Sequence, residues 1–224
     1  MDNGIIIINK PLGITSMDVI RQLRKITNIK KIGHAGTLDP LASGVLIVAI
    51  GKATKKINDL MSLSKQYKTT IDMSQFSKTD DEEGDKTKIQ INKIPTKEEI
   101  YHIIQKKFIG TIEQIPPIYS AIKIKGKKAY QLAREGKEVV MRSRNVRIEK
   151  IKIKDYQWPI LKLHIECSKG TYIRSLGKDI GVQLGVAGYL TKLKRISIGD
   201  YNIENSIELN QLNSNNWKQY LINI

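Results

Sequence analysis

Hydrophobic and polar positions alternate along the chain in patterns that predict both strands and helices. Residues 5–8 and 44–51 are almost continuous apolar runs, which are typical of strands buried on both faces of a sheet. Residues 161–167 alternate apolar and polar side chains, and this period of two predicts a strand with one buried face. Apolar residues recur at helical spacing after Thr15 and again after Thr96, where each threonine can cap the first turn.

The remaining patterns complete the predicted fold. Residues 67–73 and 146–153 favour strands, and a helix is expected after Arg174. Residues 30–43 are expected to form an irregular loop, and the acidic residues 80–85 a solvated hairpin or mobile loop, since they lack the spacing of a calcium loop. Strands and helices intermingle without a strict βαβ order. The fold class is therefore α+β, a mixed, largely antiparallel sheet flanked by helices.

The charge of the chain suggests a polyanionic partner. There are 38 Lys and Arg against 22 Asp and Glu, a net charge of +16. The excess is largest between residues 101 and 150, which hold twelve basic and four acidic side chains. Residues 115–147 are basic and lack a regular apolar period, so they are expected to form a surface excursion. Membrane surfaces and acidic proteins also attract basic surfaces, so charge favours nucleic acid without selecting it.

Several classes of protein lack their sequence signals here. No apolar segment approaches the length of a membrane-spanning helix, and no secretory signal precedes the first strand. The single cysteine, Cys167, is expected in the core and favours a reducing, cytoplasmic setting. Three histidines without metal-ligand spacing argue against a zinc site, and no phosphate loop or serine-hydrolase elbow is present. We therefore expect no metal and no nucleotide cofactor.

The candidate chemistry lies in the loop at residues 33–44, which combines several Gly and Pro with Asp39. Pro40 disfavours a helical conformation at Asp39, so the carboxylate is expected to project from extended backbone. A plain Asx turn is the structural alternative. Arg174 could pair with a carboxylate or be an ordinary surface charge, and Tyr67 could contact a ligand or only pack.

Eight strings in chain order resemble the TruB family of tRNA pseudouridine synthases. They are NKPLGITS at 9–16, GHAGTLDPLASG at 33–44, KQY at 65–67, TDDEEG at 79–84, QIPPIYSA at 114–121, GKKAY at 126–130, GTYIRSL at 170–176 and LTKLKR at 190–195. The resemblance runs from about residue 4 to residue 201, and so many ordered matches are hard to obtain by chance.

The resemblance implies roles for individual residues. Asp39 would be the catalytic aspartate that attacks the uridine, so that the base detaches, turns and rejoins its ribose through carbon 5. Tyr67 would stack on the target base and assist removal of the proton from carbon 5, and Arg174 would pair with Asp39. Three residues would line the pocket of the flipped nucleotide, and two would support the active-site loop. These are His34, Tyr172 and Leu193 for the pocket, and Lys10 and Pro11 for the loop.

The resemblance also implies the substrate and the organisation of the chain. The substrate would be uridine 55 in the T arm of tRNA, and the reaction would need no cofactor. Residues 1–224 would form one catalytic domain with a thumb-like insertion at about 115–147. The thumb would contact the RNA backbone through four lysines: Lys123, Lys125, Lys127 and Lys128.

Some features depart from the family pattern. Tyr189 stands where many relatives carry His, and Lys194 replaces an Arg. Only about twenty residues follow Tyr201, so the usual C-terminal RNA-binding domain of the PUA type is expected to be missing. A stand-alone, monomeric enzyme is the resulting expectation. A non-catalytic RNA chaperone using the same surface is the competing hypothesis.

Overall fold

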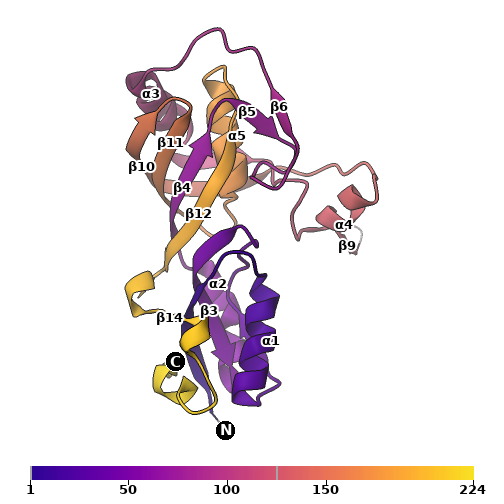
Figure 1. Ribbon diagram of the computed structural model, residues 1–224, viewed down its shortest axis with the longest axis vertical. Coiled ribbons are helices and arrows are strands. Elements are labelled where there is room, and N and C mark those ends of the chain that lie inside the picture. The colour runs from indigo at the N-terminus through magenta and orange to yellow at the C-terminus, as the bar shows by residue number, and fades with distance from the viewer. Residues whose placement is uncertain (1, 125) are drawn as a thin grey trace. The chain divides into compact units, whose positions relative to one another are not determined.

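The structure is a computed structural model, and it describes residues 2–124 and 126–224 (Figure 1). It contains two compact units. Unit 1 takes in the residues up to Lys68 together with Leu193–Ile224, and unit 2 is Thr69–Lys192. The chain passes from one unit to the other within two strands, β4 and β12. The expected division into one catalytic domain with an insertion stays a prediction.

Unit 1 is built on a sheet in the order β14-β1-β3-β12. Its strands are β1 (Gly4–Lys10), β2 (Ile32–His34), β3 (Ala42–Ile50), the end of β12 (Tyr189–Ile198), β13 (Tyr201–Asn202) and β14 (Ile207–Glu208). The strands β1 and β3 are antiparallel, with Ile6 opposite Val48. β12 runs parallel to β3, and β14 runs parallel to β1. β2 pairs with the other end of β3, and β13 pairs with β12.

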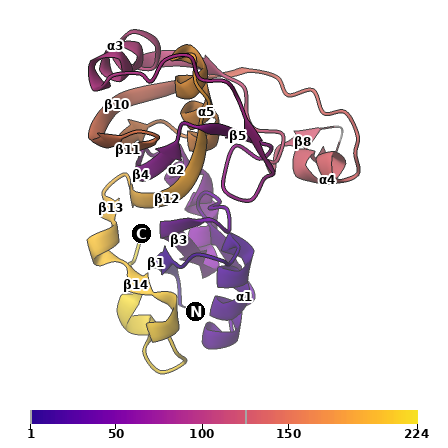
Figure 2. The ribbon, with the colours of Figure 1, turned by 45° about the horizontal axis from the view of Figure 1, so that its top comes forward.

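Both faces of this sheet are buried, because neighbouring residues of a strand point to opposite sides. The helices are α1 (Ser16–Thr27), η1 (Gly51–Lys56), α2 (Ile57–Ser62), η2 (Ile203–Asn205), η3 (Leu209–Gln211) and η4 (Trp217–Tyr220). On one face lies α1 (Figure 2), whose Val19 and Leu23 pack against Ile6 and Val48. The opposite face packs against η1 and α2. Thr15 caps α1 with a capping box, as the sequence predicts.

Unit 2 has a sheet in the order β12-β4-β11-β10-β7. Its strands are the end of β4 (Lys65–Asp72), β5 (Gln75–Ser77), β6 (Lys86–Lys88), β7 (Gly110–Gln114), β8 (Lys123–Ile124), β9 (Lys127–Lys128), β10 (Arg144–Gln157), β11 (Ile160–Cys167) and the beginning of β12. Its helices are α3 (Lys97–Lys107), α4 (Ala129–Arg134) and α5 (Ile173–Gln183). β5 with β6 and β8 with β9 form separate hairpins. Thr96 caps α3, and Cys167 is buried, both as predicted.

The α+β class is confirmed, and most predicted elements are present. Two local predictions are wrong. The loop expected at 30–43 contains the short strand β2, because residues 32–34 pair with the end of β3. The acidic residues 80–85 are not simply solvated, since Asp80 and Asp81 are 8% and 7% exposed. Within the described residues, no helix combines the length and apolar character that crossing a bilayer requires.

Candidate active site

Asp39 lies in a loop of unit 1, residues 35–41, that joins β2 to β3 and is called here the Asp39 loop. Its backbone is held from both sides by polar contacts. Ser16 Oγ donates to the Leu38 carbonyl at 3.0 Å and accepts from the Leu38 amide at 2.8 Å. The Gly13 amide donates to the Pro40 carbonyl at 2.9 Å. The turn at residues 11–14 and the start of α1 therefore define the backbone on each side of Asp39.

Lys10 supports the turn that contacts this loop. Its side chain is completely buried, and its Nζ donates to the carbonyls of Pro11 at 2.8 Å and Ile14 at 2.7 Å. Burial lowers the pKa of Lys10 to about 8, although the charge of Asp39 acts in the opposite direction. An ammonium that is expensive to bury is thus kept at the end of β1, within the electrostatic range of the Asp39 carboxylate.

Arg195 is a second buried cation beside the Asp39 loop. Only 2% of its surface is exposed, and its guanidinium donates to the carbonyls of Val45 at 2.7 Å and Gly36 at 3.0 Å. Its backbone passes so close to Gly44 that a Cβ at position 44 would lie 2.1 Å from the Arg195 carbonyl oxygen. Gly44 has φ of 103°, so both its conformation and its space require glycine. β12 and β3 are therefore in direct backbone contact at this point.

Three other predicted residues lie in unit 1. His34 ends β2, and burial, followed by the charge of Arg195, lowers its pKa. Its Nδ1 is buried and has no hydrogen-bond partner among the described residues. Tyr67 lies in β4 and is 8% exposed. Leu193 lies in β12 opposite Ala42, the residue at which β3 begins.

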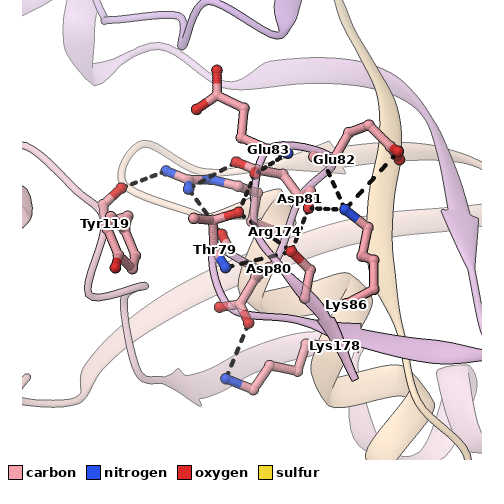
Figure 3. A network of polar contacts seen from close by, with 10 residues as sticks. Thr79, Asp80, Asp81, Glu82, Glu83, Lys86, Tyr119, Arg174 and Lys178 are labelled. Carbon is pink, nitrogen blue, oxygen red and sulfur yellow. Dashed lines mark hydrogen bonds and ion pairs between the residues drawn. The ribbon is translucent and has the colours of Figure 1, made fainter. Parts of the chain in front are cut away.

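Arg174 lies in α5 of unit 2, where it is 6% exposed and joined to a network of polar groups (Figure 3). Its Nη1 lies 3.0 Å from Asp81 Oδ2 and donates to the Thr79 carbonyl at 3.1 Å. Its Nη2 donates to the Tyr119 carbonyl at 2.9 Å. The alternative of an ordinary surface charge is wrong, because this guanidinium is buried and ion-paired. Its pairing with Asp39 stays a prediction.

Tyr172 precedes α5 and is fixed at its backbone and its ring. The Gln114 side chain accepts from the Tyr172 amide at 2.8 Å and donates to its carbonyl at 3.0 Å. The Arg144 guanidinium lies over the Tyr172 ring, 4.6 Å from its centroid, and donates to the Gly170 carbonyl. Cation and aromatic ring attract each other in this geometry. Tyr172 is thus held rigidly at the start of the helix that carries Arg174.

The basic excursion of unit 2 holds the predicted RNA-backbone lysines. Lys123, Lys127 and Lys128 are exposed on the β8–β9 hairpin. Lys125 lies outside the described residues. The region is more structured than the sequence suggests, because it includes α4 as well as the hairpin, and both views show it extending away from α5 (Figures 1 and 2).

Sequence reasoning assigned no role to several residues that organise these sites. Asp81 and Arg195 both fall in matched strings, yet only their burial reveals that they are structural ions. Ser16 follows the helix cap and gives no local signal for its contact with Leu38. Among the described residues, no three His, Cys, Asp or Glu side chains gather so as to hold a metal ion.

Comparison with known proteins identifies the family. Residues 24–173 match the N-terminal domain model of the TruB family of pseudouridylate synthases. A tRNA pseudouridine synthase B from Clostridium novyi is 45% identical over 222 residues, which are 99% of this chain and 76% of the relative. The enzyme of the same name from Fusobacterium nucleatum is 50% identical over 201 residues, covering 90% of this chain and 69% of the relative.

Solved structures agree with the sequence relatives. The chain superposes on a chain of a Cbf5-Nop10-Gar1 complex with a TM-score of 0.72 and 30% identity, covering 92% of this chain. A second match is an H/ACA RNP bound to a substrate RNA containing 2′-deoxyuridine, with a TM-score of 0.69 and 28% identity over 92% of this chain. This chain spans about half the length of those two solved chains, 52% and 51%. The match to the family model and the close sequence relatives together show that the chain belongs to the TruB family of pseudouridylate synthases.

Proposed function

We propose that this protein converts uridine 55 in the T arm of tRNA to pseudouridine, with Asp39 as the attacking carboxylate and without a cofactor. The family and the relatives named tRNA pseudouridine synthase B support the isomerisation of a tRNA uridine. The observation that carries the assignment to Asp39 is the anchoring of its loop. The backbone carbonyls at positions 36, 38 and 40 all accept hydrogen bonds from residues outside the loop.

This anchoring suits a nucleophile that must meet a fixed carbon atom. A carboxylate held before the substrate arrives avoids the cost of ordering during the reaction. The isomerisation breaks the bond between N1 and the ribose and forms one from C5 to the same carbon. The hydrogen on C5 leaves and N1 gains a proton, so no electrons are exchanged with another molecule. Side chains alone can therefore supply the chemistry.

The target base has to leave its stack before it can react. Extrusion of a stacked base costs a few kcal/mol, and an aromatic ring returns roughly 1 to 3 kcal/mol by stacking on it. We assign this stacking, and assistance in the removal of the C5 proton, to Tyr67. His34, Tyr172 and Leu193 would line the rest of the pocket. The fixed backbone and ring of Tyr172 support that assignment.

We assign Arg174 as the partner of the Asp39 carboxylate, which its positive charge would attract. The burial of its guanidinium and its contacts with Asp81, Thr79 and Tyr119 support this role. These contacts fix the direction of the side chain before substrate binds. Asp81 is then a positioning residue, since it acts through Arg174.

The basic excursion would bind the phosphates of the T arm. Lys123, Lys127 and Lys128 are exposed, and the Tyr130 ring lies 5.6 Å from both Lys128 Nζ and Arg134 Cζ. Exposed cations on a short hairpin can follow a phosphate backbone without ordering a long loop. One copy of the chain would suffice for this interaction, so we expect a monomer.

The experiment is a tritium-release assay on unmodified tRNA that carries tritium at C5 of its uridines. One equivalent per tRNA should be released, because only the converted uridine loses its C5 hydrogen. Changing uridine 55 to cytidine should abolish the release. The substitution Asp39→Asn should slow it by at least about a thousandfold, since it removes the nucleophile.

Asp59→Asn is the matched control, because Asp59 is an exposed aspartate of α2 in the same unit. It should release tritium at the rate of the unmodified protein. Full activity of the Asp39 variant would contradict the assignment. Refolding of a misfolded tRNA by both proteins without any tritium release would instead support an RNA chaperone.

A further inference from the structure

Backbone carbonyls of the acidic segment 80–85 are arranged around an ammonium group that the chain itself supplies. Residues 78–85, called here the Asp81 loop, join β5 to β6, and Lys86 is the first residue of β6. Lys86 Nζ donates to the carbonyls of Glu82 and Gly84, each at 2.8 Å, and to that of Asp81 at 3.4 Å (Figure 3). The loop therefore curls around this one nitrogen.

The remaining side of the ammonium is also occupied. Lys86 Nζ lies 4.6 Å from the centroid of the Tyr189 ring and 3.9 Å from Glu82 Oε1. An ammonium has three N–H donors, and the three carbonyls can use all of them. The Lys86 side chain is only 22% exposed, so the group is partly withdrawn from water. Carbonyl oxygens around a central positive charge are the arrangement that a loop gives to a bound cation.

The loop around Lys86 has a conformation that needs support. Asp80 has φ of 61°, in the left-handed region that non-glycine residues rarely adopt. At Gly84, a Cβ would lie 2.5 Å from both Ser77 Oγ and the Thr79 amide nitrogen. A tightly closed loop brings its carbonyl groups together, and a central positive charge offsets their mutual repulsion.

The loop presents the Asp81 carboxylate to Arg174. Asp81 Oδ1 accepts hydrogen bonds from the Thr79 hydroxyl and from the Glu83 amide. Its other oxygen, Oδ2, accepts from Arg174 at 3.0 Å. The Thr79 carbonyl, in the same loop, accepts from the same guanidinium nitrogen. Any shift of the loop therefore moves two of the groups that hold Arg174.

We infer that Lys86 is a positioning residue for the isomerisation: it holds the Asp81 loop in the shape that aims Asp81 and Thr79 at Arg174. The inference rests on the proposed role of Arg174 beside the reacting uridine. Lys86 acts through the loop, so its loss should change the rate of the chemical step. A lysine that only attracted RNA would change the binding of tRNA.

The first test compares Lys86→Met with Lys88→Met in the tritium-release assay. Both residues lie on β6, and both substitutions remove one positive charge. Lys86→Met should lower kcat roughly ten- to hundredfold with KM for tRNA unchanged, since small displacements of reacting groups have effects of this size. Lys88 is exposed, and its variant should stay within about twofold of the unmodified protein. Equal kcat in the two variants would overturn the inference.

A double-mutant cycle tests whether Lys86 acts through Asp81. If it does, adding Lys86→Met to Asp81→Asn should lower kcat by less than it does alone, because one of the two contacts through which Lys86 acts on Arg174 is already lost. If the fold-losses in kcat of the two single variants simply multiply in the double variant, Lys86 does not act through Asp81 and the inference fails.

Chemical rescue keeps the test valid if Lys86→Met folds poorly. Lys86→Cys, treated under native conditions with 2-bromoethylamine, regains an ammonium on a side chain of nearly the original length. This treatment should restore most of the lost kcat, whereas methylthiolation of the same cysteine should not. Cys167 is buried, and the unmodified protein treated identically controls for its reaction. Complete alkylation without recovery of kcat would overturn the inference.

The outcomes for the two proposals are distinguishable. If the unmodified protein releases no tritium from tRNA, the proposed function fails, whatever the Lys86 variants do. If it does release tritium and Lys86→Met is as active as Lys88→Met, the proposed function stands and the inference about Lys86 fails.

Discussion

The Asp39 loop and the Asp81 loop both place a carboxylate on a turn, but their backbone carbonyls are bonded by different kinds of residue. The Asp39 loop is held from outside by residues distant in the chain: Ser16 lies 22 positions from Leu38, and Arg195 lies 159 positions from Gly36. The carbonyls of the Asp81 loop are gathered by a near neighbour in the chain, Lys86, which lies two to five positions from them. Distant residues also contact this loop, through Asp80 and Asp81.

This difference predicts that changes in the two loops affect different quantities: the free energy of unfolding for the Asp39 loop, and the turnover rate for the Asp81 loop. The contacts of the Asp39 loop also join β12 and β3, so the loop has its shape only when unit 1 is folded. Damage there should lower the free energy of unfolding. Loss of the Lys86 bonds is local and should lower turnover more than stability, since these bonds join residues at most five positions apart.

The largest effect on stability is expected for Arg195→Met. The substitution leaves the buried carbonyls of Val45 and Gly36 without their donor, and the free energy of unfolding should fall by about 3 kcal/mol. Urea unfolding measures the change. Lys194→Met, at the adjacent exposed position, should be nearly neutral. Equal stabilities of the two variants would refute the idea that this loop depends on distant anchors.

The next effect concerns pH and Lys10. Its pKa is lowered to about 8 in the folded protein, so the unfolded chain binds more protons between about pH 8 and 10. Stability rises with pH wherever the unfolded state binds more protons. The unmodified protein should therefore gain on the order of 2 kcal/mol relative to Lys10→Met over this range.

Urea unfolding of both proteins at pH 7, 8, 9 and 10 checks this prediction. The comparison isolates Lys10, because every other lysine is present in both proteins. A constant difference in stability between them would mean that the ammonium of Lys10 is not penalised by burial.

A smaller effect on stability is expected for Gly84→Ala in the Asp81 loop. The added methyl group would meet Ser77 and Thr79, and the loop must shift at a cost of about 1 kcal/mol. Turnover should fall while KM for tRNA is unchanged. Glu83→Ala, at the adjacent exposed residue, is the control. A loss of stability as large as that of Arg195→Met would abolish the distinction between the two loops.

The smallest effect on stability is expected in the basic excursion, outside both loops. Changing Lys123, Lys125, Lys127 and Lys128 to Gln should leave the unfolding curve unchanged. Affinity for tRNA should fall roughly tenfold at moderate salt, and its salt dependence should become shallower, because fewer counterions are released. Filter binding between 50 and 200 mM salt measures both. Loss of kcat at saturating tRNA would show that these lysines do more than bind.

Much of the fold could be predicted because its signals are local. The apolar run at 44–51, the alternation at 161–167 and the threonine caps at Thr15 and Thr96 each correspond to an observed element. The short strand β2 could not be predicted, since three residues carry no period and the strand exists only by pairing with β3.

The residues of the candidate site also divide into those with a local sequence signal and those without one. Asp39, Tyr67 and Arg174 could be proposed because they lie in strings that resemble a family. The burial of Asp81 and Arg195 could not be inferred, because an ion in a polar string looks the same in sequence whether it faces water or a partner. Lys86 was missed for a related reason: a lysine after an acidic stretch suggests solvent, whereas here the stretch folds over it.

The tethering of the Lys86 ammonium has a consequence for conditions in solution. A loop whose carbonyls coordinate a metal ion from solution loses its ordered conformation when that ion is diluted or chelated. The Lys86 ammonium is covalently part of the chain, so neither dilution nor chelation can remove it from the loop. The Asp81 loop should therefore keep its shape through any change in free calcium or magnesium.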